Sequence, residues 1–265
     1  MKRTIIIGLI SMTFIATPKA SDLIHINQKA FDRLESVEYE VYDSGYAEWL
    51  AGDIELFISD DENFSVGVWK ARAGSEMIDT LYPYNVFFIL KKGQIKTKSN
   101  TGLVNSFDAG EGFLIPKDWM GMFELTQDVE LIYLYDGLVK TENDDSRDVY
   151  KDASVHFNKD IILKTLAKKN FTKGEGLLNT KEELIFNNKD DSFSIGTWES
   201  KDGSVFSQWP YDEFMYVISG QILMTDKNGI RTVIDPNEGI VVPAGWEGDF
   251  SVPNNVVKIW SIYDK

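Results

Sequence analysis

The residues best suited to chemistry lie between positions 207 and 213. Ser207, Trp209, Tyr211 and Glu213 occupy alternate positions, and alternate side chains of a strand share one face. A carboxylate among aromatic groups is a candidate general acid or base, or an anchor for a polar ligand. We therefore predict a ligand site here, with Glu213 as its tentative catalytic residue. The competing interpretation is that Glu213 is a solvated or hydrogen-bonded carboxylate without a function of its own.

Few other residues offer reactive groups. The chain has no cysteine, which excludes disulfides, thiolate catalysis and cysteine-based metal sites. His25 and His156 are its two histidines, and each follows an aliphatic residue in similar short segments, Ile-His-Ile-Asn and Val-His-Phe-Asn. Because the two histidines take equivalent places, we interpret them as packing or hydrogen-bonding residues and not as catalytic bases.

These residues belong to a module that occurs twice. Phe-Ser-Val-Gly-Val-Trp at 64–69 matches Phe-Ser-Ile-Gly-Thr-Trp at 193–198, and Tyr-Pro-Tyr at 82–84 matches Trp-Pro-Tyr at 209–211. Further matches continue to the end of each copy. The repeat predicts one domain at 21–136 and a second at 152–265, joined by a polar, charged linker at 137–151.

Each copy is predicted to consist mainly of short strands. Residues 217–224, 240–242 and 256–260 are rich in strand-forming side chains, and Pro243 ends the second of these runs. Lys-Asn-Gly at 227–229 is typical of a hairpin turn, since Asn-Gly accepts positive φ. Short helices are predicted at 28–34 and 159–169. Many short strands with Gly and Pro between them indicate an all-β barrel or sandwich.

Two segments of the second copy resemble cupin motifs. Glu-Phe-Met-Tyr-Val-Ile-Ser-Gly at 213–220 is similar to the end of the first motif, and Asn-Glu-Gly-Ile-Val-Val-Pro-Ala-Gly-Trp at 237–246 is similar to the second. The closest subgroup includes ethanolamine-utilisation cupins and relatives of ureidoglycine aminohydrolase. The resemblance implies two tandem antiparallel jelly-roll barrels (double-stranded β-helices) packed about a pseudo-twofold axis. It also places Glu213 inside the second barrel, with Trp246 as a further ligand-binding residue.

Many cupins hold a divalent metal through three histidines and that glutamate. Carried over by the resemblance, the ligand positions are Ser207, Trp209, Glu213 and Gly248 in the second copy and Thr80, Tyr82, Val86 and Gly121 in the first. One carboxylate without imidazoles is a poor transition-metal site, so we predict no metal and no other cofactor, with a weakly bound divalent cation at Glu213 as the alternative.

The first copy lacks the carboxylate on the equivalent face, which reads Thr80, Tyr82, Tyr84, Val86 and Phe88. We therefore predict that the first barrel is filled or purely apolar, and that it is a structural partner and not a second site. Trp69 and Trp198 recur in both copies, and we interpret them as packing residues and not as ligand-stacking ones.

Composition bounds the partners and the location. The net charge of −15 disfavours nucleic acid and anionic lipid. Residues 1–20 combine Lys2 and Arg3, an apolar run and Ala20, a pattern typical of a signal peptide; a retained anchor is the alternative. We expect a periplasmic or secreted protein, monomeric or homodimeric, with no membrane contact once the signal is removed.

Three functions follow in order of preference. The first is binding of a small polar metabolite in the C-terminal barrel, at Ser207, Trp209, Tyr211, Glu213 and Trp246. The second is a ureidoglycine aminohydrolase-like enzyme that acts on a small nitrogenous or carboxylated metabolite with Glu213 as acid or base. The third is a scaffold with both barrels filled.

Overall fold

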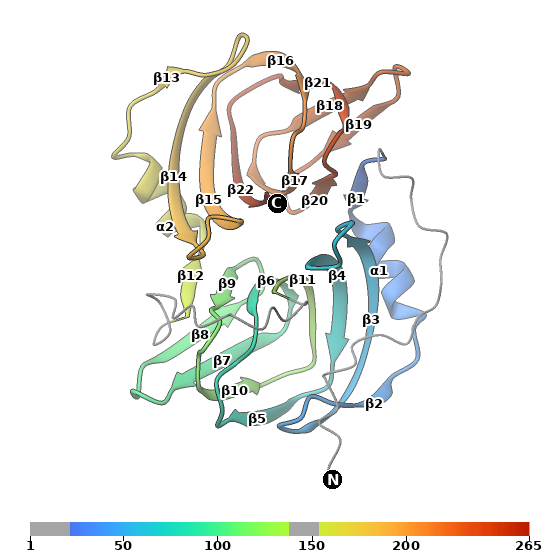
Figure 1. Ribbon diagram of the computed structural model, residues 1–265, viewed down its shortest axis with the longest axis vertical. Coiled ribbons are helices and arrows are strands. Elements are labelled where there is room, and N and C mark those ends of the chain that lie inside the picture. The colour runs from blue at the N-terminus through green and yellow to red at the C-terminus, as the bar shows by residue number, and fades with distance from the viewer. Residues whose placement is uncertain (1–21, 138–153, 265) are drawn as a thin grey trace. The chain divides into compact units, whose positions relative to one another are not determined.

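The computed structural model describes residues 22–137 and 154–264, and within them the chain is almost entirely β. The predicted signal peptide, 1–20, and nearly all of the predicted linker, 137–151, lie outside the described residues. By their contacts the residues form two units, and each unit contains a seven-stranded and a four-stranded antiparallel sheet (Figure 1). The all-β prediction with two barrels is confirmed.

The first unit places its strands in two sheets that share one core. The seven-stranded sheet runs β12 (Val155–Phe157), β9 (Gly112–Ile115), β6 (Asn85–Lys92), β11 (Val129–Asp136), β4 (Phe64–Ala71), β3 (Glu48–Ile58) and β2 (Glu40–Asp43). The four-stranded sheet runs β5 (Gly74–Ile78), β10 (Gly121–Leu125), β7 (Gln94–Ser99) and β8 (Val104–Asp108). Inward side chains of both sheets, such as Val86 and Phe107, meet in one buried cluster.

The second unit repeats this order. Its seven-stranded sheet runs β1 (Ile24–Ile26), β20 (Gly239–Val242), β17 (Asp212–Ser219), β22 (Val256–Tyr263), β15 (Phe193–Ser200), β14 (Asn179–Asn187) and β13 (Thr172–Lys173). Its four-stranded sheet runs β16 (Gly203–Gln208), β21 (Glu247–Val252), β18 (Ile222–Asp226) and β19 (Arg231–Ile234). Met215 and Trp246 are among the side chains at the centre of its core.

Each unit takes its outermost strand on one side from the other copy of the repeat. Strand β1 pairs with β20 of the second unit, with Ile24 opposite Val241, whereas β12 lies beside β9 of the first. The predicted domains, 21–136 and 152–265, follow the repeat in the sequence. The compact units differ from these domains because each unit includes one strand from the other copy. The added strand covers the backbone groups at an otherwise open sheet edge.

Local signals read from the sequence match the structure. Both predicted helices are present, as α1 (Gln28–Glu35) and α2 (Lys159–Leu166). The side chain of Asn158 caps α2 by accepting from the Ile161 N–H at 2.8 Å. The predicted hairpin turn joins β18 to β19, with Gly229 at φ +80°.

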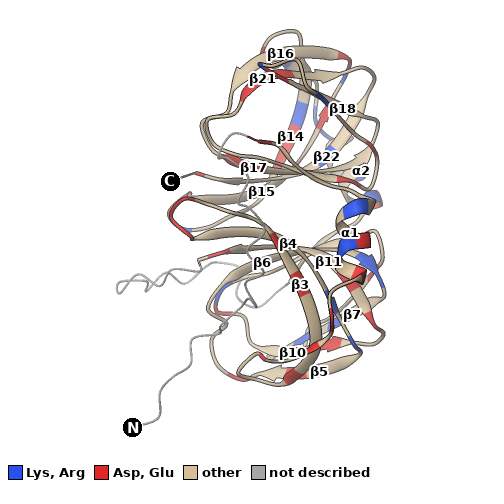
Figure 2. Ribbon diagram, turned by 90° about the vertical axis from the view of Figure 1, so that its right-hand side faces the viewer, with Lys and Arg blue, Asp and Glu red and all other residues tan. Residues whose placement is uncertain are grey.

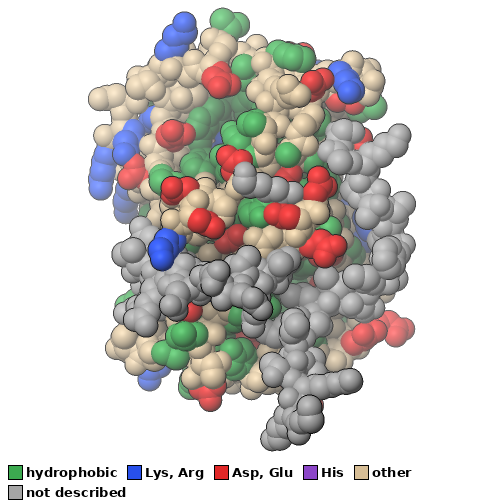
Figure 3. Space-filling model, viewed as in Figure 1, with side chains coloured by type: hydrophobic (Ala, Val, Ile, Leu, Met, Phe, Trp, Pro, Cys, Tyr) green, Lys and Arg blue, Asp and Glu red, His purple; other side chains and the backbone are tan. Residues whose placement is uncertain are grey.

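Acidic side chains are distributed over both units. Figure 2 shows Asp and Glu on strands of each unit, including β3, and in Figure 3 they are spread among apolar and neutral groups on the face in view. No helix within the described ranges is long and apolar enough to span a membrane.

Candidate functional site in the first barrel

A cavity of about 290 Å³ lies inside the first barrel. Ten of its 21 lining residues are aromatic, and strand alternation on β3, β6 and β11 turns Trp49, Phe88, Tyr133 and Tyr135 inward. The aromatic residues are Tyr42, Tyr46, Trp49, Trp69, Tyr82, Tyr84, Phe88, Phe123, Tyr133 and Tyr135. The prediction that the first barrel is filled is therefore wrong: Tyr82, Tyr84 and Phe88 line a space and do not close it.

Neighbouring rings in this wall stand nearly perpendicular to one another. Tyr84 meets Tyr82 at 6.0 Å and Tyr135 at 5.9 Å between ring centroids, with interplanar angles of 88° and 89°. Trp49 meets Trp69 edge-on at 6.5 Å. Such T-shaped contacts are the favoured geometry for aromatic pairs and help to hold the rings of the wall in place.

Four carboxylates also line the cavity: Glu38, Glu40, Asp53 and Glu76. Glu76, on β5, is held in place because its Oε2 accepts from Trp49 Nε1 at 3.0 Å and from Ser44 Oγ at 2.5 Å. Glu38 and Glu40 are exposed, so this part of the lining reaches the solvent. No Lys, Arg or His is found among the described residues of the lining.

Burial and mutual repulsion shift the pKa values of these groups. Burial, then the charge of Glu40, raises the pKa of Asp53, and the nearby Tyr133 hydroxyl offsets this only in part. The two groups stand close without the geometry of a hydrogen bond, since Tyr133 Oη has no hydrogen-bond partner among the described residues. Burial, then the charge of Glu76, raises the pKa of Tyr42, so the phenol stays neutral at physiological pH.

The residues predicted as the site lie in the second barrel, and the structure brings three of them together. Trp209 Nε1 donates to Glu213 Oε2 at 2.8 Å, and the Trp209 and Trp246 rings meet at 5.4 Å and 75°. Ser207 is opposite Gly248 on β21, and Tyr211 packs against the rim of the core. The segment is not one strand, because β16 ends at Gln208 and β17 begins at Asp212.

Sequence reasoning missed the partner of Glu213, which is Lys258 on β22. Lys258 Nζ donates to Glu213 Oε1 at 2.8 Å, and the two side chains are only 7% and 6% exposed. The ammonium also lies 5.0 Å from the Trp198 ring centroid and 5.5 Å from that of Phe250. Both oxygens of Glu213 thus have protein partners. A single lysine in the apolar run Val-Val-Lys-Ile-Trp was the signal that could have revealed it.

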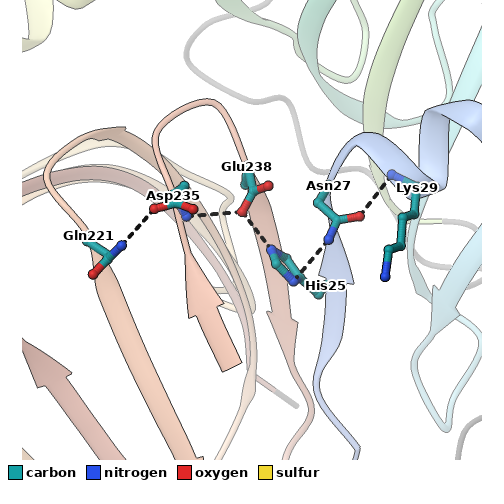
Figure 4. A network of polar contacts seen from close by, with 6 residues as sticks. All are labelled: His25, Asn27, Lys29, Gln221, Asp235 and Glu238. Atoms are coloured by element: carbon teal, nitrogen blue, oxygen red, sulfur yellow. Dashed lines mark hydrogen bonds and ion pairs between the residues drawn. The ribbon is translucent and has the colours of Figure 1, made fainter. Parts of the chain in front are cut away.

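The two histidines lie on the exchanged strands, and the His156 ring packs edge-on against the core residue Phe107 with 5.0 Å between ring centroids. His25 Nε2 is 2.9 Å from Glu238 Oε2, which also accepts from the Asp235 N–H at 3.0 Å (Figure 4). His156 Nε2 is 3.0 Å from Glu111 Oε2 in the first unit. The same histidine–glutamate contact in both units supports the structural interpretation of these residues.

Comparison with known proteins agrees with this architecture. Residues 187–260 match the EutQ-like cupin domain family. A solved structure of a DUF861 protein of unknown function from Pseudomonas syringae pv. tomato has a TM-score of 0.67 at 14% identity, covering 91% of this chain and 99% of that one. A cupin 2 conserved barrel protein from Leptotrichia buccalis gives 0.60 at 12%, covering 96% and 100%. Salicylate 1,2-dioxygenase from Pseudaminobacter salicylatoxidans gives 0.62 at 10%, covering 96% and 87%. The protein has a bicupin fold. No curated protein matches its sequence.

Many cupins bind a metal, but the donor set of this protein does not fit one. Neither barrel supplies an imidazole at the expected positions, and Glu213 is already ion-paired with Lys258. At Gly248 a Cβ would lie 2.3 Å from the Thr225 carbonyl oxygen and 2.5 Å from the Trp246 ring, so no larger side chain fits. The described residues contain no cluster of three or more His, Asp or Glu placed to hold a metal ion.

Strand register shows which residues of the two barrels are equivalent. Trp69 is opposite Leu131 on β11, and Trp198 is opposite Lys258 on β22, so Leu131 and Lys258 are equivalent. The position of Glu213 corresponds likewise to Val86, which faces the first core. The buried ion pair of one barrel is thus replaced by two apolar side chains in the other.

Proposed function

We propose that this bicupin binds a small organic molecule in the cavity of its first barrel. The observation that carries the proposal is the 290 Å³ cavity with its aromatic wall and carboxylates. Ligand pockets are typically concave and mostly apolar, with a few polar groups that orient the ligand. The volume is near the lower end for such pockets, which favours a metabolite of few atoms.

The second barrel is the less favourable place for this function. There the interior carboxylate, Glu213, already receives hydrogen bonds from Trp209 and Lys258, and Trp246 packs on Trp209. A ligand at Glu213 would have to displace one of these buried donors. Binding or acid–base catalysis at Glu213, including ureidoglycine aminohydrolase-like activity, stays a prediction that these contacts disfavour.

A matched pair of cavity-filling variants tests which barrel binds. Ala51 lines the first cavity, and Thr180 on β14 is its equivalent in the second barrel. The equivalence follows from strand pairing: Ala51 is opposite Ala71, and Thr180 is opposite Ser200, the residue that matches Ala71 in the repeat. A thermal-shift screen of small cationic, anionic and neutral metabolites is run on the wild type, Ala51→Leu and Thr180→Leu. We expect compounds that stabilise the wild type and Thr180→Leu but not Ala51→Leu. Equal stabilisation of all three proteins would contradict a first-barrel site.

We also propose that the protein acts outside the cytoplasm after removal of residues 1–20, as a monomer or homodimer without a nucleic-acid partner. Support comes from the charged start and apolar run of this segment and from the net charge of −15. Amino-terminal sequencing of the mature protein tests the cleavage; a chain that still begins at Met1 in the soluble cell fraction contradicts it.

A further inference from the structure

The first-barrel cavity collects negative charge, and none of its described lining residues is a Lys, Arg or His that would balance it. Asp53 and Glu76 are only partly accessible to solvent, and Glu38 and Glu40 stand closer to the surface. Partly buried carboxylates are costly unless a cation or hydrogen-bond donors compensate them. Both hydrogen bonds to Glu76 end on Oε2, which leaves its Oε1 for a ligand.

The second barrel shows how this fold accommodates a cation. The Lys258 ammonium lies between the Glu213 carboxylate and the rings of Trp198 and Phe250. It therefore combines an ion pair with two cation–π contacts inside a barrel.

The first barrel keeps the aromatic part of that arrangement and lacks the ammonium. Trp69 and Phe123, the counterparts of Trp198 and Phe250, both line the cavity. The lysine is replaced by Leu131, which cannot occupy the charged position. The carboxylates come from elsewhere, with Asp53 opposite Trp69 and Glu76 opposite Phe123.

We propose that the first-barrel cavity binds an organic ammonium ion, with the charged nitrogen between Asp53, Glu76 and the aromatic wall. This inference rests on the proposed function of the same cavity. The ligand's ammonium group takes the role that Lys258 plays in the second barrel.

The polar groups of the cavity suit this ligand. Carboxylate oxygens of Asp53 and Glu76 accept N–H bonds from a primary ammonium or face a quaternary nitrogen. Burial raises the pKa of Tyr133 and Tyr135, so these lining residues stay neutral at physiological pH. An anionic ligand would instead meet four carboxylates and no positive side chain among the described lining residues.

The decisive probe is a pair of compounds that have the same shape and differ in charge. Choline and 3,3-dimethylbutan-1-ol differ only by nitrogen in place of carbon, and acetate serves as the anion. Binding is measured by calorimetry and by the fluorescence of the wall tryptophans, for the wild type, Asp53→Asn and Glu182→Gln. Glu182 is the control because it takes the place of Asp53 in the second barrel: Glu182 is opposite Trp198, and Asp53 is opposite Trp69. Glu182 is exposed to solvent.

We expect choline to bind at least about tenfold more tightly than its neutral analogue, and Asp53→Asn to weaken choline about tenfold without affecting the analogue. Glu182→Gln should leave both affinities unchanged. If the neutral analogue or acetate binds as tightly as choline and Ala51→Leu abolishes that binding, the cation inference fails and the cavity remains a binding site. If neither these probes nor the metabolite screen shows a ligand that Ala51→Leu affects, the proposed function itself fails.

Discussion

The buried pair of Glu213 and Lys258 allows a quantitative test, because the protein contains its own apolar counterpart. Replacing Lys258 with Leu leaves the Glu213 carboxylate in a site of about 6% exposure with a single donor, Trp209 Nε1. Breaking one side of a buried pair typically costs about 3–5 kcal/mol of unfolding free energy. Glu213→Val should cost a similar amount, since the ammonium keeps only its two aromatic neighbours.

The double variant should recover much of this loss. Glu213→Val with Lys258→Leu installs the residues that the first barrel has at the equivalent positions, Val86 and Leu131, and removes both charges at once. The remaining cost is about 1–3 kcal/mol for the buried Trp209 N–H, which loses its acceptor. The two single losses should therefore exceed the double loss by about 3 kcal/mol or more.

Urea unfolding followed by tryptophan fluorescence and circular dichroism measures this cycle. The barrels form two compact units, so each transition is fitted separately, and only the second unit should respond. Val86→Ala with Leu131→Ala in the first unit is the control cycle and should show a much smaller coupling. Additive losses for Glu213→Val and Lys258→Leu would refute the reasoning, because they would mean that the ion pair is not coupled in the folded protein.

Three further predictions concern single positions. Burial and then Glu40 raise the pKa of Asp53, so the folded state keeps a proton that the unfolded chain has lost, and stability falls as the pH rises above the ordinary aspartate pKa of about 4. In thermal melts, Asp53→Asn should therefore gain stability relative to the wild type as the pH is raised above that value. His25→Leu should lower the unfolding free energy of the second unit by about 1 kcal/mol, because it removes a partly buried hydrogen bond to Glu238. His156→Leu should cost the first unit less, because Nε2 lies near Glu111 without the geometry of a hydrogen bond. No change for His25→Leu would contradict the anchoring role. Gly248→Ala should destabilise the second unit strongly, because the new Cβ would clash with the Thr225 carbonyl oxygen. Gly245→Ala should cost only about 1 kcal/mol, because a Cβ there meets no atom within 4 Å and the cost is that of the φ of +85°.

The sequence predicts the fold well because the repeat and its turn signals are local. Asn-Gly at 228–229 makes a hairpin wherever two strands flank it, and Pro243 ends β20 because it cannot continue the ladder. Strand exchange could not be read in this way. The segment of Ile24 to Ile26 has the same pattern whichever sheet edge it joins, and only three-dimensional packing decides between the edges.

The site was harder to predict, because its charged residues lie outside the motif positions. Asp53 is one of three acidic residues in strand β3 and Glu76 is the one in β5, and the sequence does not reveal which of them face the core and which the solvent. Glu213 was correctly singled out as a carboxylate beside Trp209, but its neutralising partner is 45 residues away. Long-range pairing of this kind leaves only a faint trace in one sequence, namely the lysine in an apolar strand.

The two barrels together suggest a reason for the asymmetry. A barrel interior with aromatic walls favours a cation, and that cation can be either a side chain or a ligand. In the second barrel the Lys258 ammonium is the cation beside the aromatic rings, and the Glu213 carboxylate neutralises its charge. This interior therefore requires no cationic ligand. In the first barrel Leu131 leaves the place of that ammonium open while Asp53 and Glu76 still supply negative charge. An interior that keeps uncompensated carboxylates is less stable than a filled one, and such a cost is typical of a site retained for binding.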